Sequence, residues 1–293
     1  MPTNEQRRAT AKRKLERQLE RRAQQARRRR QLAIIGGSVA AVVVIAAVVA
    51  GVLWTNRDHK KHQGSAGGST STSAAPDTSG APPLPAFKPA ADLGANCQYP
   101  ASDEPASKPV NPPRQGKVPT DPAQVSVSMV TNQGNIGLLL ANNESPCTVN
   151  SFASLAQQKF FDDTKCHRFT ASPSLGVLQC GDPTAQGTGG PGYRFANEYP
   201  TDQYPPGDPA LKEPVVYPRG TLAMANSGPD ATNGSQFFLV YKDSQLPPQY
   251  TVFGKIQPDG LATLDKIAKA GVAGGAPDGP PATEVTIKSV MLD

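Results

Sequence analysis

Apolar and polar residues alternate along several short stretches in the C-terminal half of the chain. Val125–Thr131 alternates with a period of two, the polar residues Asn132–Asn135 follow, and Ile136–Leu140 returns as an apolar run. This pattern predicts a β-hairpin whose strands each bury one face. Glu284–Met291 has the same period and predicts a closing strand near the C-terminus.

Two other segments repeat apolar residues at helical spacing. Ser145 and Pro146 precede the first, and Leu261–Ala270 forms the second. Serine is favoured at helix N-caps and proline at the first helical position, so Ser145 is expected to cap a helix. The apolar positions of that helix are Val149, Phe152, Leu155 and Ala156.

Short apolar runs bounded by Gly, Pro, Asn and Asp fill the region between these helices. They are Val177–Gln179, Thr221–Ala225, Gln236–Tyr241 and Tyr250–Ile256. Many short strands with only two helices predict a mainly β fold, either a closed antiparallel barrel or a sandwich. Repeated glycine-rich corners favour the barrel. The folded domain is expected to cover residues 122–293.

The longest apolar run lies near the N-terminus. Leu32–Trp54 contains 23 residues without a charge, enough at about 1.5 Å per residue to cross a hydrocarbon core of about 30 Å. A buried core helix and a cleaved signal peptide are the alternatives. No polar residue interrupts the run, and it exceeds the roughly 7–15 apolar residues of a signal peptide. It therefore predicts an uncleaved transmembrane signal-anchor helix.

Positive charge is concentrated before this run. Met1–Arg30 carries twelve Lys and Arg and three Glu, a net charge of +9, whereas the whole chain is +6 and the remainder is therefore −3. Arg27–Arg30 directly precede the apolar run, so the positive-inside rule predicts a basic cytoplasmic tail (residues 1–31) and an extracytoplasmic remainder. DNA binding by the tail is the alternative, while the acidic remainder argues against nucleic-acid binding by the domain.

Residues 55–121 are rich in Ser, Gly, Ala, Thr and Pro and contain few large apolar residues. This composition predicts a disordered linker. Cys97 breaks the pattern, and we expect Asn96–Tyr99 to be pinned to the following domain. An even number of cysteines beyond a membrane span indicates disulfides, with three possible pairings, and four free thiols are the alternative. The cysteines are Cys97, Cys147, Cys166 and Cys180.

Candidate chemistry is found in two segments about sixty residues apart. Gly228–Phe238 has the sequence GPDATNGSQFF, and Cys166–Phe169 contains a single arginine, Arg168. They contain no nucleophile–base pair, no cluster of metal ligands and no phosphate cradle. Gly187–Gly190 is glycine-rich, but no Lys-Ser/Thr pair follows it. An apolar pocket with one fixed cation and several amides suits a reaction that breaks no bond, and neither cofactor nor metal is expected.

Six motifs resemble those of the cyclophilin-type peptidyl-prolyl isomerases, in the family's order and close to its spacing. They are Cys166–Phe169 (CHRF), Gln179–Pro183 (QCGDP), Gly187–Tyr193 (GTGGPGY), Leu222–Asn226 (LAMAN), Asn233–Phe238 (NGSQFF) and Val252–Lys255 (VFGK). The resemblance covers about residues 122–293, and the layout is similar to a membrane-anchored, exported, actinobacterial-like form. It implies a closed eight-stranded antiparallel barrel capped by two helices, without a cofactor, as a monomeric catalytic domain.

The resemblance also implies roles for individual residues. Arg168 matches the catalytic arginine, and Gln179 matches the glutamine that orients it. The implied substrate-binding residues are Val177, Gly187, Ala225, Asn226, Ser227, Gln236, Phe238, Leu246 and Tyr250. By period two, Phe237 is expected in the core while Phe238 faces the pocket. His167 is expected to be a structural hydrogen-bonding residue, because isomerisation transfers no proton.

The resembled fold places Cys166 and Cys180 on neighbouring strands, which implies the disulfides Cys166–Cys180 and Cys97–Cys147. The function implied is acceleration of X–Pro isomerisation during folding of exported proteins, with their Pro-containing segments as partners.

Two departures from the family pattern keep a second function open. Gly176 stands where the family has a phenylalanine, although Leu175 could take its place, and Tyr250 stands where it has a histidine. The alternative is a non-catalytic module that binds Pro-containing peptides on a membrane tether.

Overall fold

The computed structural model describes residues 80–228 and 232–293. These residues fall within one unit, residues 74–293. The predicted basic tail (residues 1–31), the predicted membrane span (residues 32–54) and residues 55–79 of the predicted linker lie outside the described residues. Among the helices that are described, none is both long and apolar enough to cross a membrane.

Strands supply most of the regular structure. They are β1 (Gln124–Thr131), β2 (Gly134–Ala141), β3 (Thr164–Lys165), β4 (Arg168–Thr170), β5 (Gly176–Cys180), β6 (Val215–Tyr217), β7 (Thr221–Met224), β8 (Phe237–Lys242), β9 (Ser244–Leu246), β10 (Val252–Ile256), β11 (Asp278–Gly279) and β12 (Thr286–Leu292). The predicted hairpin is confirmed as β1 and β2, which pair in continuous register from Gln124↔Ala141 to Thr131↔Gly134. The predicted closing strand is β12, which pairs antiparallel with β1.

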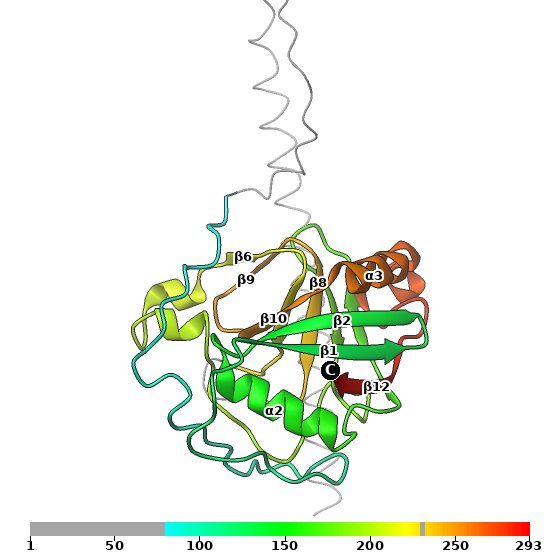
Figure 1. The fold of residues 1–293 in the computed structure, drawn as a ribbon. Helices are drawn as coiled ribbons and strands as arrows, with labels where there is room; N and C mark the ends of the chain where they lie inside the picture. Colours follow the sequence, from blue (N-terminus) through cyan, green and yellow to red (C-terminus); the bar gives the residue numbers. More distant parts are fainter. Residues whose placement is uncertain (1–79, 229–231) are drawn as a thin grey trace, which may run out of the picture. The chain divides into compact units, whose positions relative to one another are not determined.

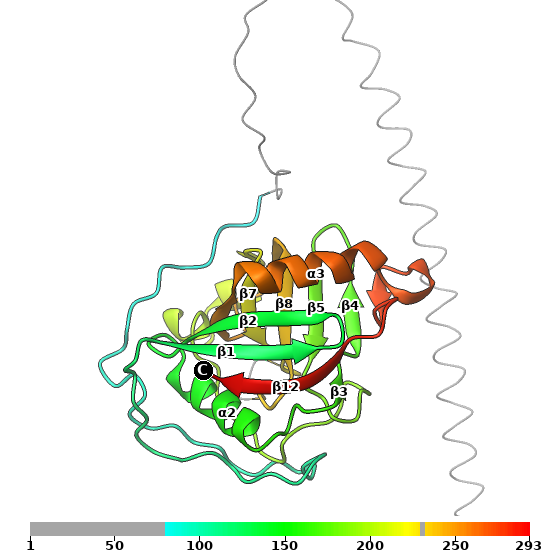
Figure 2. The same ribbon diagram turned by 45° about the vertical axis from the view of Figure 1, so that its right-hand side comes forward.

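Ten of these strands form one curled sheet in the order β11-β4-β5-β8-β7-β10-β2-β1-β12-β3, and β6 and β9 form a separate pair. Figure 2 shows β1, β2 and β12 crossing in front of β5 and β8 at a steep angle. The expected closed eight-stranded barrel is not what the ladders show, because no pairing joins β11 to β3 in the described part. β3 and β4 follow one another in the chain but lie near opposite ends of the strand order. The N–H of Cys166, between them, donates to the carbonyl of Val285 and continues the pairing of β3 with β12.

Two α-helices cover opposite ends of the curled sheet, as Figure 1 and Figure 2 show. They are α2 (Pro146–Gln157) and α3 (Pro258–Ala270), which confirm the two predicted helices. Short 3-10 helices occupy Thr201–Gln203, Pro209–Lys212 and Ala273–Gly275. Phe152 of α2 anchors the core through ring contacts with Phe161, Phe237 and Phe253 at centroid distances of 5.0–5.4 Å.

The start of α2 is capped in a way that the sequence did not predict. Ser145 occupies the N-cap position, but its hydroxyl donates to the carbonyl of Val252 at 2.8 Å and makes no capping bond. The carboxylate of Glu198 caps instead. It accepts from the N–H groups of Cys147 and Thr148 at 2.9 and 2.7 Å, and from the Thr148 hydroxyl at 2.7 Å. A distant loop therefore fixes the first turn of the helix.

Glu198 predicts a pH dependence of folding stability. Burial raises the pKa of its carboxyl to about 7, although the hydrogen bonds from Thr148 and Cys147 act in the opposite direction. The folded state then keeps a proton that the unfolded state releases near its ordinary pKa of 4.5. The free energy of unfolding should consequently fall as the pH rises from about 4.5 to about 7, by up to about 1.4 kcal/mol per pH unit.

Urea titrations of the parent and of Glu198→Gln at several pH values measure this contribution. Glutamine cannot titrate, so the fall across this window should be smaller in the variant by that amount. Parallel pH dependences in the two proteins would contradict the prediction.

Residues 80–121 pack against the domain, so the prediction that they belong to a disordered linker is wrong. Figure 1 shows this segment, cyan to blue-green, running around the outside of the domain past α2. Cys97, Tyr99 and Val118 are at most 3% exposed. The ring of Tyr99 meets the rings of Tyr193 and Phe195 edge-on at 5.6 Å. The segment has little regular structure, but Leu84, Phe87 and Val110 are also partly buried against the domain.

Both proposed disulfides are confirmed. Cys97 bonds to Cys147 at the start of α2, fifty residues away in sequence. Cys166 bonds to Cys180 across fourteen residues, with their Cα atoms 4.0 Å apart. The first bond ties residues 80–121, which we call the wrapping segment, to the rest of the domain. The second joins the chain just before β4 to the end of β5, beside the strands that carry Arg168 and Gln179.

Candidate active site

A pocket of about 120 Å³, lined by both apolar and polar side chains, opens beside β4, β5 and β8. It is lined by Arg168, Leu175, Val177, Gln179, Ala225, Asn226, Phe238, Leu246 and Tyr250. Eight of these nine residues are site residues predicted from the sequence, and they come from five separate stretches of chain. The fold therefore brings the predicted arginine, the amides and the apolar side chains to one place. We call this cavity the proline pocket, because the family resemblance implies that a proline ring binds there.

The floor of the proline pocket is aromatic. Phe238 is 4% exposed, and its ring meets that of Tyr250 edge-on at 5.7 Å. Phe237, the next residue on β8, is fully buried and packs in the main core beside Phe152. The alternation expected from period two is thus confirmed, because successive side chains of a strand point to opposite faces.

The departure at Gly176 has a structural explanation. A Cβ atom at this position would lie 2.3 Å from Cγ of Lys242, so the aliphatic stem of that lysine fills the space of a side chain. The register between β5 and β8 shifts between Gly176 and Val177. Leu175 lines the pocket, in the place that the sequence analysis allowed for it. The pocket wall is therefore built without an aromatic residue at position 176.

Arg168 stands at the edge of the proline pocket, held from both neighbouring strands. On β5, Gln179 lies directly opposite and its Oε1 accepts from Nη1 at 3.2 Å. On β11, the carboxylate of Asp278 accepts from Nε at 2.8 Å and from Nη2 at 2.7 Å. The hydrogen bond to Asp278 raises the pKa of Arg168, and the same bond lowers the pKa of Asp278. The side chain of Arg168 remains 41% exposed, so a bound peptide can reach it.

A chain of amides continues from Gln179 away from the pocket. Its Nε2 donates to Oε1 of Gln236 at 2.9 Å, and Nε2 of Gln236 donates to the carbonyl of Gly189 at 3.0 Å. Arg168, two glutamines and the loop at Gly189 thus form one hydrogen-bonded series. We call it the amide chain.

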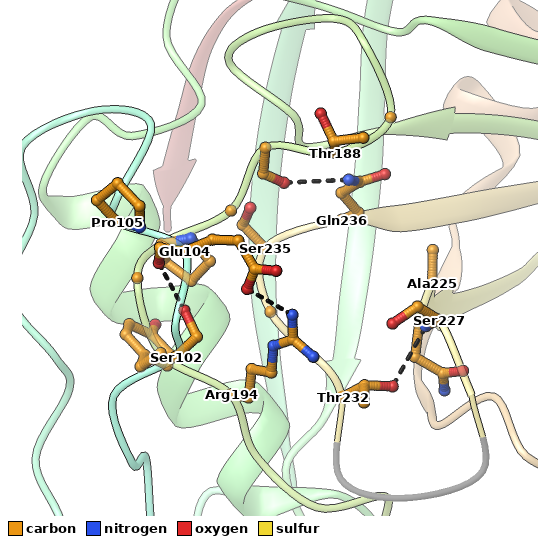
Figure 3. Close-up of a pocket in the computed structure, with 18 of the residues that line it drawn as sticks. Ser102, Glu104, Pro105, Thr188, Arg194, Ala225, Ser227, Thr232, Ser235 and Gln236 are labelled. Atoms are coloured by element: carbon orange, nitrogen blue, oxygen red, sulfur yellow. Dashed lines mark hydrogen bonds and ion pairs between the residues drawn. The ribbon is translucent and has the colours of Figure 1, made fainter. Parts of the chain in front are cut away.

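The amide chain leads to a second, larger pocket of about 310 Å³. Gly187, Ser227 and Gln236 line it, and Gln179, Ala225 and Asn226 are shared with the proline pocket. Figure 3 shows its rim, where Arg194 pairs with Glu104 of the wrapping segment at 2.7 Å. A cavity next to the proline pocket can receive a neighbouring side chain of an extended peptide.

The loop under the second pocket is organised by a buried carboxylate. Asp182 accepts hydrogen bonds from the N–H groups of Thr184, Gln186 and Gly187, and from the Thr184 hydroxyl. Burial alone would raise the pKa of Asp182, but these hydrogen bonds outweigh it and lower the pKa. A Cβ atom at Gly189 would lie 2.0 Å from Oδ1 of Asp182, so only glycine fits there.

Asn226 lines both pockets and lies between them. Its side-chain amide donates to the carbonyl of Gln249 at 2.8 Å and is therefore committed to the fold. The neighbouring Ala225 N–H is likewise used, donating to the carbonyl of Gln236. These bonds fix the backbone that forms the lip between the pockets.

His167 does not form the hydrogen bonds expected of it. Its Nδ1 atom is buried without a partner in the described part of the chain. Burial lowers the pKa of His167, and the adjacent Arg168 guanidinium lowers it further, although Asp182 acts in the opposite direction. The imidazole thus packs beside Arg168 as a neutral ring.

Sequence reasoning missed the residues that reach the site from outside the six motifs and the predicted elements. Asp278 lies in a Gly/Pro-rich stretch after α3, and Ser102, Glu104 and Pro105 lie in the segment assigned to the linker. No periodicity marks these positions. Charge gave no signal either, because Asp278 is a single acid among uncharged residues and Glu104 simply follows Asp103 in the segment assigned to the linker.

Comparison with known proteins agrees with this geometry. Residues 126–292 match the family model described as cyclophilin type peptidyl-prolyl cis-trans isomerase/CLD. A Mycobacterium tuberculosis relative named Probable peptidyl-prolyl cis-trans isomerase B is 72% identical over all of this chain and 95% of its own length. A Mycobacterium leprae relative of the same name is 71% identical over the full length of both chains. A Helicobacter pylori peptidyl-prolyl cis-trans isomerase is 39% identical over 48% of this chain and 79% of its own. The chain belongs to the cyclophilin-type peptidyl-prolyl cis-trans isomerases and is an isomerase of this family.

Proposed function

We propose that this isomerase accelerates X–Pro isomerisation in exported polypeptides, with Arg168 and Gln179 as its catalytic pair. The observation that carries the proposal is the position of the Arg168 guanidinium, fixed at the edge of a pocket with an aromatic floor, whose volume of about 120 Å³ suits a proline ring. Phe238 forms the floor of this pocket, and Leu246 and Val177 complete its wall.

The chemistry follows from the nature of the amide bond. Resonance holds the X–Pro bond planar, with a barrier of about 18–20 kcal/mol. In the twisted transition state this resonance is lost, and the prolyl nitrogen becomes pyramidal and able to accept a hydrogen bond. A fixed guanidinium donates to that nitrogen in the transition state but not in either planar ground state. Such differential binding lowers the barrier.

The two pockets would bind different parts of the peptide. The proline pocket holds the ring while the preceding carbonyl rotates, and the lip at Ala225–Ser227 lies beside the peptide backbone. Gly187 and Gln236 in the second pocket would contact residues that precede the proline. Arginine suits the catalytic position because it stays charged and because a hydrogen bond to Gln179 can hold its planar guanidinium in one orientation.

Exchange spectroscopy on an Ala-Pro peptide tests the catalytic part of the proposal. The full-length protein in detergent micelles should broaden the cis and trans resonances through catalysed exchange, and a pocket variant, Phe238→Ala, should do so much less. Peptide binding without exchange would support instead a non-catalytic Pro-peptide binding module.

For the setting of the reaction we propose an anchored protein outside the cytoplasmic membrane. Leu32–Trp54 would span the membrane, the basic residues 1–31 would remain in the cytoplasm, and the domain would act as a monomer on newly exported chains. The two disulfides support this setting, because such bonds persist in oxidising compartments.

Protease treatment of intact spheroplasts tests the topology. The domain should be digested while a tag placed before residue 32 is protected. Protection of the domain would overturn the proposed location without affecting the catalytic proposal.

A further inference from the structure

Asp278 occupies a position that none of the six motifs includes. We propose that it is a positioning residue for isomerisation, whose carboxylate fixes the guanidinium of Arg168 against the proline pocket. The inference rests on the proposed catalytic role of Arg168. It adds a second support for that guanidinium, on the side opposite Gln179.

Strand order explains why two supports are available. β4 lies between β11 and β5, so both of its neighbours can present side chains to Arg168. Gln179 lies directly opposite Arg168 on β5. On β11, Asp278 pairs with Thr170 of β4, and this makes Asp278 a diagonal neighbour of Arg168. Diagonal neighbours on paired strands are within reach of a long side chain such as arginine.

The backbone that carries Asp278 is itself well fixed. The strap from Gly271 to Ala282 is closed by a hydrogen bond between its ends at 2.9 Å. A second bond, from the N–H of Ala171 to the carbonyl of Pro277 at 2.8 Å, ties the strap to the chain after β4. At the base of the strap, Val272 is buried, with 5% of its surface exposed. The carboxylate is therefore presented from an anchored element.

The bonding pattern leaves donors for a substrate. A guanidinium has five N–H donors. Asp278 receives one from Nε and one from Nη2, and Gln179 receives one from Nη1. Two N–H donors are left over, among the hydrogen bonds within the described residues, and both belong to the terminal nitrogens. Fixing the plane of the fork from two sides sets the direction of these remaining donors.

Exposure separates a positioning role from a stabilising one. The side chains of Arg168 and Asp278 are 41% and 48% exposed. Ion pairs at such exposure contribute little to folding stability. Loss of the Asp278 carboxylate should therefore change the motion of Arg168 and the rate of isomerisation while leaving the melting temperature nearly unchanged.

The experiment compares Asp278→Asn and Asp278→Glu with a matched control, Asp265→Asn, in the full-length protein. Asp265 also forms a two-point ion pair with an arginine, accepting from Arg219 at 2.8 and 2.9 Å, but neither residue lines the proline pocket or the second pocket. Asp278→Asn should lower kcat by about tenfold or more, with KM changed by less than about twofold. Asp278→Glu should restore part of the loss, and Asp265→Asn should leave kcat unchanged.

A spectroscopic readout distinguishes positioning from any general weakening of the domain. The Nε–H resonance of Arg168 should show a high ¹⁵N order parameter in the parent and a lower one in Asp278→Asn. Unchanged kcat and order in Asp278→Asn, alongside inactive Arg168→Ala, would overturn the inference and leave the proposed role of Arg168 intact. Full activity in Arg168→Ala would overturn both.

Discussion

Replacing Arg168 by alanine is expected to lower kcat/KM for an Ala-Pro peptide by about 10²–10³-fold, the range found when one preorganised donor to a transition state is removed. The reason is that the guanidinium interacts with the pyramidal prolyl nitrogen only while the amide is twisted. The proline pocket remains in the variant, so peptide affinity should fall much less than the rate. Line-shape analysis of the exchanging peptide resonances measures both quantities in one titration.

Arg168→Lys refines this prediction. Lysine keeps the charge but replaces a planar fork by a single ammonium group, which Asp278 and Gln179 cannot hold in one plane. We expect the loss to be nearly as large as for alanine.

Arg219→Ala is the matched control for both variants. This arginine has a similar exposure, 36%, and also pairs with an aspartate, but it lies outside both pockets. Its rate should equal that of the parent. An Arg168→Ala protein with more than about half of the parent's kcat/KM would show that the charge at the pocket edge does not drive isomerisation.

Replacing Cys97 and Cys147 together by serine is expected to lower the free energy of unfolding by about 4 kcal/mol. The bond closes a loop of fifty residues, and the chain-entropy model assigns about this value to a loop of that length. Urea unfolding under non-reducing conditions measures the change. Hydrogen exchange should also become faster in residues 97–118, because Tyr99 and Val118 would lose the covalent anchor that keeps them docked.

The second disulfide provides the comparison. Replacing both Cys166 and Cys180 by serine removes a cross-link that closes a loop of only fourteen residues. The same model gives a loss of about 3 kcal/mol in the free energy of unfolding for a loop of this length. A larger loss from this pair than from Cys97 and Cys147 would show that loop length does not set the order. This pair should in addition affect activity, because it adjoins the strands of Arg168 and Gln179.

Local sequence predicted those parts of the fold whose signal is periodic. The β1–β2 hairpin and both helices have apolar residues at the spacing of one buried face, so each could be found from a short window. The residues of the proline pocket were predicted differently, through six motifs that resemble a family. Periodicity alone would have left Arg168 as one more surface cation.

Features that depend on a single distant contact could not be predicted. Glu198 caps a helix that starts about fifty residues earlier in the chain, and Asp278 meets an arginine 110 residues away. Residues 80–121 have the composition of a linker, because an irregular segment that docks on a preformed surface needs few apolar residues. The sheet does not close into the expected barrel. This could not be predicted for a related reason, since its two edge strands, β3 and β11, have only two residues each.

The amide chain has a direction, and that direction is imposed from one end. Since Arg168 can only donate, Oε1 of Gln179 must face it, and the NH₂ group of Gln179 must then face Gln236. The same constraint turns the NH₂ group of Gln236 toward the carbonyl of Gly189. One cation thus sets the polarity of two side-chain amides and reaches the backbone of the second pocket. A peptide residue that entered the second pocket would therefore meet the amide of Gln236 in an orientation set by Arg168, at the edge of the other pocket.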